Sequence, residues 1–208
     1  MRLLRDSWQV VLENRRAYLT INVLYYGLVL AGMAVSFARP EVQQELLTVV
    51  GQAFSTTGEM ASVLTAYQSG DIWSASVLTF GVNLILGSFL VLTLPSLIVP
   101  FSGLVMGAYR AILWGLLLAP QGVLALPMIP HSLTLVLEGQ GYILALLGAY
   151  TVGKGLFWPR AYGAQGHLQG YLAGVRRCAR LYVLVMVVLA VAAVYEALEV
   201  ILIVARMG

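Results

Sequence analysis

Residues 76–119 read SVLTFGVNLILGSFLVLTLPSLIVPFSGLVMGAYRAILWGLLLA and carry a single charged side chain, Arg110. About 20 apolar residues in helical conformation cross the hydrocarbon core of a bilayer, so this stretch is long enough for two crossings. Only Pro100 separates the two halves. It predicts a tight turn between antiparallel helices over 76–99 and 101–119. The chain is therefore predicted to be an integral membrane protein.

Three further apolar segments have the length of a membrane span, and they cover 17–37, 131–152 and 181–204. The predicted fold is an all-α bundle of about five transmembrane helices in one membrane domain, 1–208. The composition agrees, because 60% of the residues are hydrophobic and 10% are charged, against roughly a quarter charged in soluble domains. The first segment is longer than the apolar region of a cleaved signal peptide, so it is expected to remain as the first span.

Two amphipathic helices are expected outside the spans. In the outer loop, 38–75, apolar residues recur at helical spacing and predict a helix that lies on the outer surface or caps the bundle. Its apolar positions are Val42, Leu46, Val49, Val50 and Ala53. The N-terminal residues 1–16 predict a short interfacial helix on the cytoplasmic side, with an apolar face made by Leu4, Trp8, Val11 and Leu12. Three prolines in 120–130 predict a loop or a re-entrant segment.

The distribution of basic residues predicts the orientation, because Lys and Arg collect on the cytoplasmic side of a membrane protein. With five crossings and Arg110 left aside, nine basic residues fall on the side of the N-terminus and two on the other. The nine are Arg2, Arg5, Arg15, Arg16, Lys154, Arg160, Arg176, Arg177 and Arg180, and the two are Arg39 and Arg206. We expect a multi-pass protein of the cytoplasmic (inner) membrane, with a cytoplasmic N-terminus, a cytoplasmic loop over 153–180 and an outer C-terminus.

Polar residues inside the spans are the candidate site, since ionisable groups in a bilayer are costly and need partners. The candidate network comprises Asn83, Arg110, His131 and Glu138. His131 and Glu138 are seven residues apart and share a helix face, and Arg110 is expected to pair with Glu138. Two interpretations remain open: a functional site, or contacts that only hold helices together. Glu196 and Glu199 are weaker candidates, because they are expected to reach the outer interface.

Other function classes receive no support from the residue pattern. No nucleophile can be placed beside a general base, so the chain is not expected to be an enzyme. His131 and His167 fall on opposite sides of the membrane, and neither a metal nor another cofactor is expected. The basic residues lack the interleaved aromatics of nucleic-acid surfaces, so nucleic acid is not an expected partner. The single cysteine, Cys178, cannot form an intrachain disulfide.

Several short motifs together resemble the stage II sporulation protein M family. They are Asn83, Phe101-Ser102-Gly103, Ile129-Pro130-His131-Ser132 and Ala192-Ala193-Val194-Tyr195-Glu196-Ala197. The resemblance spans nearly the whole chain in order and spacing. The chain departs from the family at three positions, with Ser102 in place of Asn, Ser132 in place of Gly and Leu135 in place of Glu. Glu138 stands one turn beyond the last of these and is a candidate to replace the missing carboxylate.

The resemblance implies a non-enzymatic membrane subunit of a cell-envelope complex, embedded in the lipid bilayer and part of a homo- or hetero-oligomer. The residues also favour an alternative, the permease-like subunit of an ATP-driven exporter, with a cytoplasmic ATPase as its partner. That alternative rests on the basic N-terminal helix, the long cytoplasmic loop, the proline-broken outer segment and the buried charges.

Overall fold

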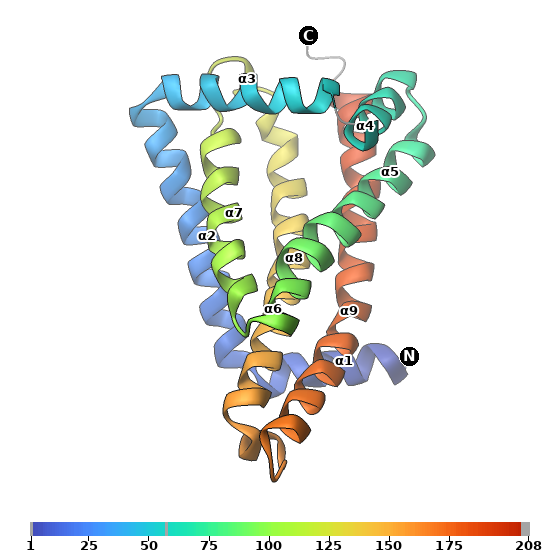
Figure 1. The fold of residues 1–208 in the computed structure, drawn as a ribbon. Helices are drawn as coiled ribbons and strands as arrows, with labels where there is room; N and C mark the ends of the chain where they lie inside the picture. The colour runs from blue at the N-terminus through green and yellow to red at the C-terminus, as the bar shows by residue number, and fades with distance from the viewer. Residues whose placement is uncertain (1, 57, 205–208) are drawn as a thin grey trace.

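The computed structural model describes residues 2–56 and 58–204, without the side chains of 53–60, and the described chain is all-helical (Figure 1). Arg206 lies outside this range. In chain order the helices are α1 (Arg2–Glu13), α2 (Arg15–Ala38), α3 (Pro40–Thr56), α4 (Gly58–Ser69), α5 (Ile72–Gly81), η1 (Val82–Thr93), α6 (Leu94–Ile98), α7 (Ser102–Leu117), η2 (Gly122–Leu124), α8 (Met128–Phe157), η3 (Pro159–Tyr162), α9 (His167–Leu198) and η4 (Glu199–Ile203).

Four helical rods are long and apolar enough to cross a membrane. They are Arg15–Ala38, Ile72–Ile98, Met128–Phe157 and His167–Ile203. The predicted all-α fold is confirmed, and these four rods have the length and composition of membrane spans. The second rod is continuous through α5, η1 and α6, and its middle part, η1, is wound as a π-helix. The fifth expected span is the shorter helix α7.

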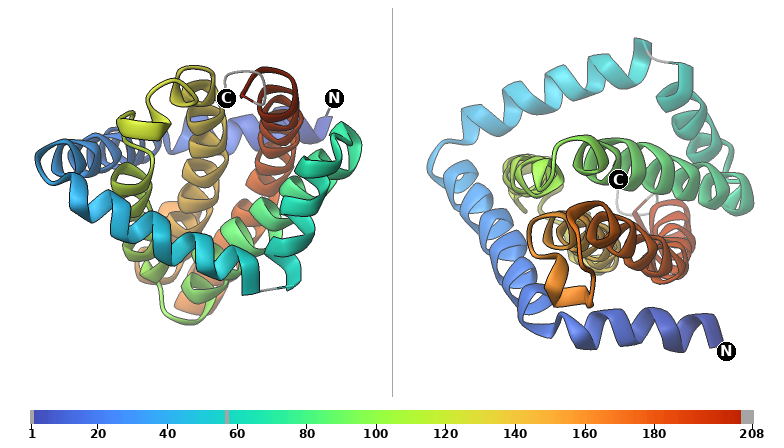
Figure 2. Two further views of the ribbon diagram at one scale, coloured as in Figure 1. Left: turned by 90° about the horizontal axis from the view of Figure 1, so that it is seen from above. Right: turned by 60° about the horizontal axis from the view of Figure 1, so that its bottom comes forward.

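The rods run between two ends of the molecule (Figure 1). One end carries α1 and the turn between α8 and α9, and the other carries α3 and α4. Seen from the first end, α1, α2, α3 and α4 follow one another around the outside of the remaining helices (Figure 2). The N-terminal third of the chain therefore forms a frame around the second rod, α7, α8 and α9.

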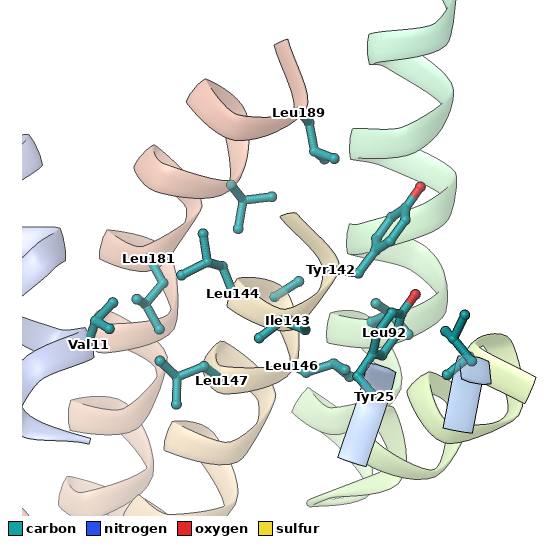
Figure 3. Close-up of a cluster of buried hydrophobic side chains, with 14 of the residues drawn as sticks. Val11, Tyr25, Leu92, Tyr142, Ile143, Leu144, Leu146, Leu147, Leu181 and Leu189 are labelled. Carbon is teal, nitrogen blue, oxygen red and sulfur yellow. The ribbon is translucent and has the colours of Figure 1, made fainter. Parts of the chain in front are cut away.

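The core lies where α8 packs against α9, α2 and η1. Leucines of α8 meet leucines of α9, and Val11 of α1 reaches the same cluster (Figure 3). Glycines allow α8 and α9 to approach closely at the end near α1. A Cβ on Gly174 would lie 2.5 Å from the Thr151 carbonyl oxygen, and a Cβ on Gly155 would overlap the Gly170 carbonyl. Small residues of this kind favour tight helix packing inside membranes.

The segment 153–180 was expected as a cytoplasmic loop and is instead mostly helix. Helix α8 continues to Phe157 and α9 begins at His167, so only a short turn containing η3 connects them. The close glycine contacts between α8 and α9 continue through Gly155 and Gly170, and this packing explains why both helices extend beyond the apolar segments. The decline in hydropathy near residue 152 marks the end of the apolar segment, whereas the helix itself ends later.

Helix α7 ends before the predicted limit of the span 101–119, because side chains of other helices cap its C-terminal carbonyl groups inside the bundle. The Ser36 hydroxyl donates to the Leu116 carbonyl at 2.7 Å. The side-chain amide of Gln43 donates to the carbonyls of Leu117 and Ala119, at 2.9 Å each. The last carbonyl groups of a helix lack intrahelical partners, so these bonds allow α7 to end away from water.

The outer loop 38–75 contains helices α3 and α4 and the start of α5. The amphipathic helix expected there is α3, but its contact with the bundle includes a polar residue. Gln43 is only 4% exposed, whereas Val49 of the expected apolar face is 62% exposed. Ala53 and Glu59 belong to the side chains that the structure does not describe. The hydrogen bonds from Gln43 to the end of α7 therefore fix the position of α3, and the apolar pattern of α3 did not predict this contact.

The structure adds detail to two further expectations, the N-terminal helix α1 and the proline-rich segment 120–130. In α1 the buried residues are Ser7, Val10 and Val11, which face α9, whereas Leu4, Trp8 and Leu12 are exposed. The predicted apolar stripe therefore points mainly away from the bundle. The segment 120–130 forms a loop with the short helix η2, in which Val123 is 84% exposed while Leu124 and Met128 pack against the core.

Candidate functional site: a polar cavity between the helices

A cavity of about 560 Å³ opens between the second rod, α7, α8 and α9, with α4 at its outer end. Most of its wall is aliphatic. The side chains in the wall that carry polar groups, apart from one tryptophan, are Tyr67, Thr79, Asn83, Arg110, Glu138 and Glu196. Cavities of this size with a few convergent polar groups are typical of small-molecule sites. Three of the residues predicted as a polar network therefore line one cavity, together with Glu196.

Asn83 connects two residues of α8. Its amide nitrogen donates to Glu138 Oε1, and its amide oxygen accepts a hydrogen bond of 2.8 Å from the Tyr142 hydroxyl. Asn83 lies in the π-wound part of the second rod, where the Ser88 hydroxyl donates to the Asn83 carbonyl at 2.9 Å. Departures from α-helical winding often occur at functional sites. The hydrogen bond from Asn83 holds Glu138, a residue that is 8% exposed, in the wall of the cavity.

Arg110 does not form the expected ion pair with Glu138, because within the described chain no carboxylate oxygen lies within 4 Å of its guanidinium. Instead, the guanidinium carbon lies 4.0 Å from the centroid of the Tyr142 ring and 5.1 Å from that of Trp114. The aromatic faces stabilise the cation where water is scarce. Arg110 thus lies against the ring of Tyr142, the Tyr142 hydroxyl binds Asn83, and Asn83 binds Glu138.

A glycine provides the space for this arrangement. A Cβ on Gly87 would lie 3.0 Å from Tyr142 Cε1, 3.2 Å from the Tyr142 hydroxyl and 3.4 Å from Arg110 Nη2. The first two distances are shorter than ordinary van der Waals contact. Gly87 thus allows both the aromatic ring and the guanidinium to lie against the second rod.

His131 and Glu199 form a second polar group beside the cavity. The Glu199 carboxylate receives a hydrogen bond of 2.6 Å from the Thr134 hydroxyl, and its other oxygen lies 3.0 Å from His131 Nδ1. Glu199 is only 1% exposed. The prediction that Glu199 reaches the outer interface is therefore wrong. The physical reason is the pairing with His131 and Thr134, which satisfies the buried carboxylate.

Glu196 belongs to the cavity rather than to the outer interface. One of its carboxylate oxygens, Oε2, is buried without a hydrogen-bond partner in the described chain. The residue faces Tyr67 of α4, whose hydroxyl lies 3.0 Å from that of Thr79. Burial raises the pKa of the Tyr67 phenol, and the nearby Glu196 carboxylate raises it further. Glu196 therefore lines the cavity, and its Oε2 lies buried in the wall without a geometric hydrogen-bond partner in the described chain.

Sequence reasoning missed the contributions of Tyr142, Thr134 and Tyr67. Tyr142 follows Glu138 by four residues and so shares its helix face, a signal that was available in the sequence. Thr134 is likewise four residues before Glu138. Tyr67 gave no signal, because it reaches the cavity from a helix outside the expected spans.

The other residues named in the sequence analysis, His167, Ser102 and Cys178, lie away from the cavity. His167 is at the opposite end, where its Nδ1 lies 2.7 Å from the Leu156 carbonyl oxygen. Ser102 begins α7, near the turn at Pro100, and Cys178 is buried against Gly148. Across residues 2–56 and 58–204, no group of three or more His, Cys, Asp and Glu side chains is placed to hold a metal ion.

In comparisons with protein-family models, curated proteins and solved structures, nothing matches this chain.

Proposed function

We propose that this chain is a non-enzymatic subunit of a membrane transport complex, with a permease-like role, and that the cavity binds the transported molecule. One observation carries the proposal: a cavity between apolar helices is lined by Arg110, Glu138 and Glu196, and none of these side chains forms an ion pair in the described chain. Glu196 Oε2 and Arg110 Nε are both buried and have no hydrogen-bond partner in the described chain. Groups of this kind are expensive to retain in a membrane unless something else binds them.

The wall of the cavity indicates the chemistry of the ligand. Two carboxylates, Glu138 and Glu196, face one guanidinium, Arg110, whose charge is already stabilised by aromatic rings. A ligand with an ammonium group or several N–H or O–H donors would pair with the carboxyl groups of Glu138 and Glu196 in the wall. The aliphatic remainder of the wall suits an apolar portion of the same molecule. We therefore propose a cationic, amphipathic ligand.

A second candidate is a subunit of a cell-envelope complex of the stage II sporulation protein M type. It is supported by where the resembling motifs lie in space. Asn83 contacts Glu138, His131 contacts Glu199, and Glu196 lines the same cavity. Motif residues that are distant in the sequence thus gather around one site, although Ser102 does not join them. In this candidate the cavity would bind a side chain of a partner rather than a free molecule.

Both candidates include a specific membrane topology. We propose five crossings in the cytoplasmic membrane, with α7 as the short crossing, a cytoplasmic N-terminus and an outer C-terminus. The positions of the ends support it, because the basic α1 and the α8–α9 turn share one end and the acidic segment around Glu41, Glu45 and Asp71 lies at the other. Basic residues favour the cytoplasmic side.

Cysteine labelling tests the topology. Native Cys178 is buried, so single cysteines are placed at Ser69 and at Gln165, both exposed, in a Cys178→Ala background. An impermeant maleimide should label Ser69→Cys in intact cells and Gln165→Cys only after the membrane is opened. The reverse pattern would invert the proposed orientation.

Purification in mild detergent from the native source tests the function. The transport proposal predicts an ATPase that co-purifies in fixed stoichiometry, detected by native mass spectrometry. The ATP hydrolysis of that complex should change in Glu138→Gln and Glu196→Gln. It should not change in Gln140→Leu, a control on the opposite face of α8. Co-purification of an envelope hydrolase or scaffold without any ATPase would reject transport in favour of the second candidate.

A further inference from the structure

A second cavity system lies at the opposite end of the bundle from the polar cavity. An apolar groove of about 480 Å³ runs between α2, α7 and α8, and a smaller pocket of about 380 Å³ adjoins it at the junction of α1 and α2. The two share Arg16, Ala17 and Tyr150 in their walls. The groove and the pocket therefore form one continuous feature with an apolar part and a basic part.

The lining of the apolar part suits a hydrocarbon chain rather than a polar ligand. Its wall is made by aliphatic residues of three helices, including Ile21, Leu24, Leu104 and Ala108. Arg16 stands at one end of this wall, next to the basic pocket. An occupant must therefore be apolar along most of its length and anionic or polar at one end.

The basic part carries positive charge that the protein does not neutralise. Arg15, Arg16 and Lys154 line it, and in the described chain none has a carboxylate within 4 Å. Lys154 Nζ instead donates to Asn14 Oδ1 at 2.9 Å and lies 5.4 Å from the Tyr162 ring centroid. The one carboxylate in the wall, Glu13, already faces Arg177, with 3.6 Å between Oε2 and Nε.

The first turn of α2 adds to the attraction for an anion. Asn14 precedes this helix, but its side chain donates to the Val10 carbonyl and makes no capping hydrogen bond to α2. The amide groups of a helix N-terminus favour phosphate groups. Together with the three unneutralised cations, they make this pocket suitable for a phosphodiester.

We propose that this feature binds one anionic phospholipid, with its phosphate among Arg15, Arg16 and Lys154 and one acyl chain in the groove between α2, α7 and α8. The inference requires that the chain lies in a membrane, but it does not depend on the transport proposal. Basic pockets between transmembrane helices on the cytoplasmic side are known to favour anionic headgroups. A bound lipid would connect α2 to α8 at the point where α1 turns across the bundle.

Native mass spectrometry of the full chain in detergent tests the headgroup. Dioleoyl phosphatidylglycerol and dioleoyl phosphatidylcholine have identical chains, so their difference reports charge. The proposal predicts tighter binding of the anionic lipid. In Arg16→Gln/Lys154→Gln this binding should weaken about 25-fold, about fivefold for each charge removed. The control Arg160→Gln/Arg176→Gln removes two exposed basic residues of the same end and should change binding less than twofold.

The chain-binding groove is tested separately. Glycerol 3-phosphate carries the anionic group without the chains and should bind at least about tenfold more weakly than the lipid. A phosphatidylglycerol with a diazirine in its acyl chain should label wild-type peptides containing residues 20–28 and 104–108. Ala108→Phe should reduce that labelling by filling the groove. Equal binding of the two lipids, an unchanged double variant, tight binding of glycerol 3-phosphate or labelling confined to other helices would overturn the proposal.

Discussion

Two polar clusters lie on opposite faces of α8, only two residues apart in the sequence, and they differ in how completely they are satisfied. On one face, Gln140 accepts from the Tyr18 hydroxyl at 2.7 Å and donates to Asn22 Oδ1 at 2.8 Å and to the Tyr26 hydroxyl at 3.1 Å. Tyr26 in turn donates to the Val136 carbonyl at 2.8 Å. This cluster is neutral, and each of its groups has a partner.

On the other face, Glu138 belongs to a charged cluster with unused hydrogen-bonding capacity. Arg110 Nε and Glu196 Oε2 are without partners in the described chain, and a cavity lies beside them. The comparison shows what distinguishes a contact between helices from a candidate site. Both clusters are polar and both lie within apolar helices, but only the charged cluster lines this cavity and has buried atoms without partners in the described chain.

The largest effect is expected from Glu138→Leu. This change leaves the Asn83 amide without its acceptor and removes a carboxylate that interacts electrostatically with Arg110. Because an uncompensated buried charge remains, stability in detergent should fall by about 3 kcal/mol. Thermal unfolding followed by size-exclusion chromatography measures it. Glu138→Gln, which keeps an acceptor for Asn83, should lose much less. Arg110→Leu/Glu138→Leu should be more stable than Glu138→Leu alone, and the charge argument fails if it is less stable.

A smaller loss is expected from Gln140→Leu on the neutral face. Three side-chain hydrogen bonds disappear, each worth about 0.6 kcal/mol inside a membrane protein, so the loss should be about 2 kcal/mol. The same thermal assay measures this loss of stability, and Val136→Leu, a change at an exposed position of the same helix, is the control. Ligand binding and ATPase coupling should survive this change. If Gln140→Leu abolished them while Glu138→Gln did not, the assignment of the two faces would be reversed.

Gly87→Ala probes the packing behind Arg110 and should have a smaller effect again. The added methyl group meets Tyr142 Cε1 at 3.0 Å and must displace the ring and the guanidinium by a few tenths of an ångström. Overpacking of this size should destabilise the protein by about 1 kcal/mol. Gly81→Ala is the matched control on the same rod, because its Cβ meets no atom within 4 Å. Equal unfolding temperatures for the two variants would show that the ring is not held tightly.

The sequence predicted the four apolar rods in their order, because long apolar segments are visible in hydropathy, whereas the fifth expected span is the shorter helix α7. It did not predict helix ends. The glycines Gly155, Gly170 and Gly174 extend the α8–α9 pair beyond the apolar segment through close packing, and hydropathy does not record such contacts. The early end of α7 likewise depends on Gln43, which comes from a helix outside the spans.

For the candidate site, the sequence identified residues more successfully than pairings. Depth along the helices placed Asn83 and Glu138 at one level, and they are in contact. The rotation of each helix about its own axis decides which groups face each other, and this rotation cannot be read from a single sequence. Arg110 therefore contacts Tyr142 rather than Glu138, and His131 contacts Glu199. The stabilising role of an aromatic ring for a cation is also hard to predict, because tyrosines occur throughout the chain.

The smallest effect is expected at Asp71, a carboxylate that faces water and sharpens the contrast with Glu138. It caps α5, since Oδ1 accepts from the backbone amides of Trp73 and Ser74, at 3.0 and 3.2 Å, and Oδ2 accepts from the Ser74 hydroxyl at 2.5 Å. The hydroxyl of Ser74 and these amides lower the pKa of Asp71 below its ordinary value of 3.8. Its stabilising contribution is therefore present above that value and is lost as the pH falls through the lower pKa of the folded state.

Asp71→Ala should accordingly lower the unfolding temperature by no more than a few °C at pH 7. The difference from wild type should shrink as the pH falls below the ordinary pKa of 3.8 and then through the lower pKa of the folded state, where the wild-type carboxylate becomes protonated. Asp71→Asn retains a capping oxygen and should lie between the two. Unfolding curves between pH 7 and pH 3 measure all three proteins, and a difference that stays constant over this range would contradict a role for the charge. Because Asp71 is satisfied by its own helix, its loss should not affect ligand binding, whereas loss of the incompletely satisfied Glu196 should.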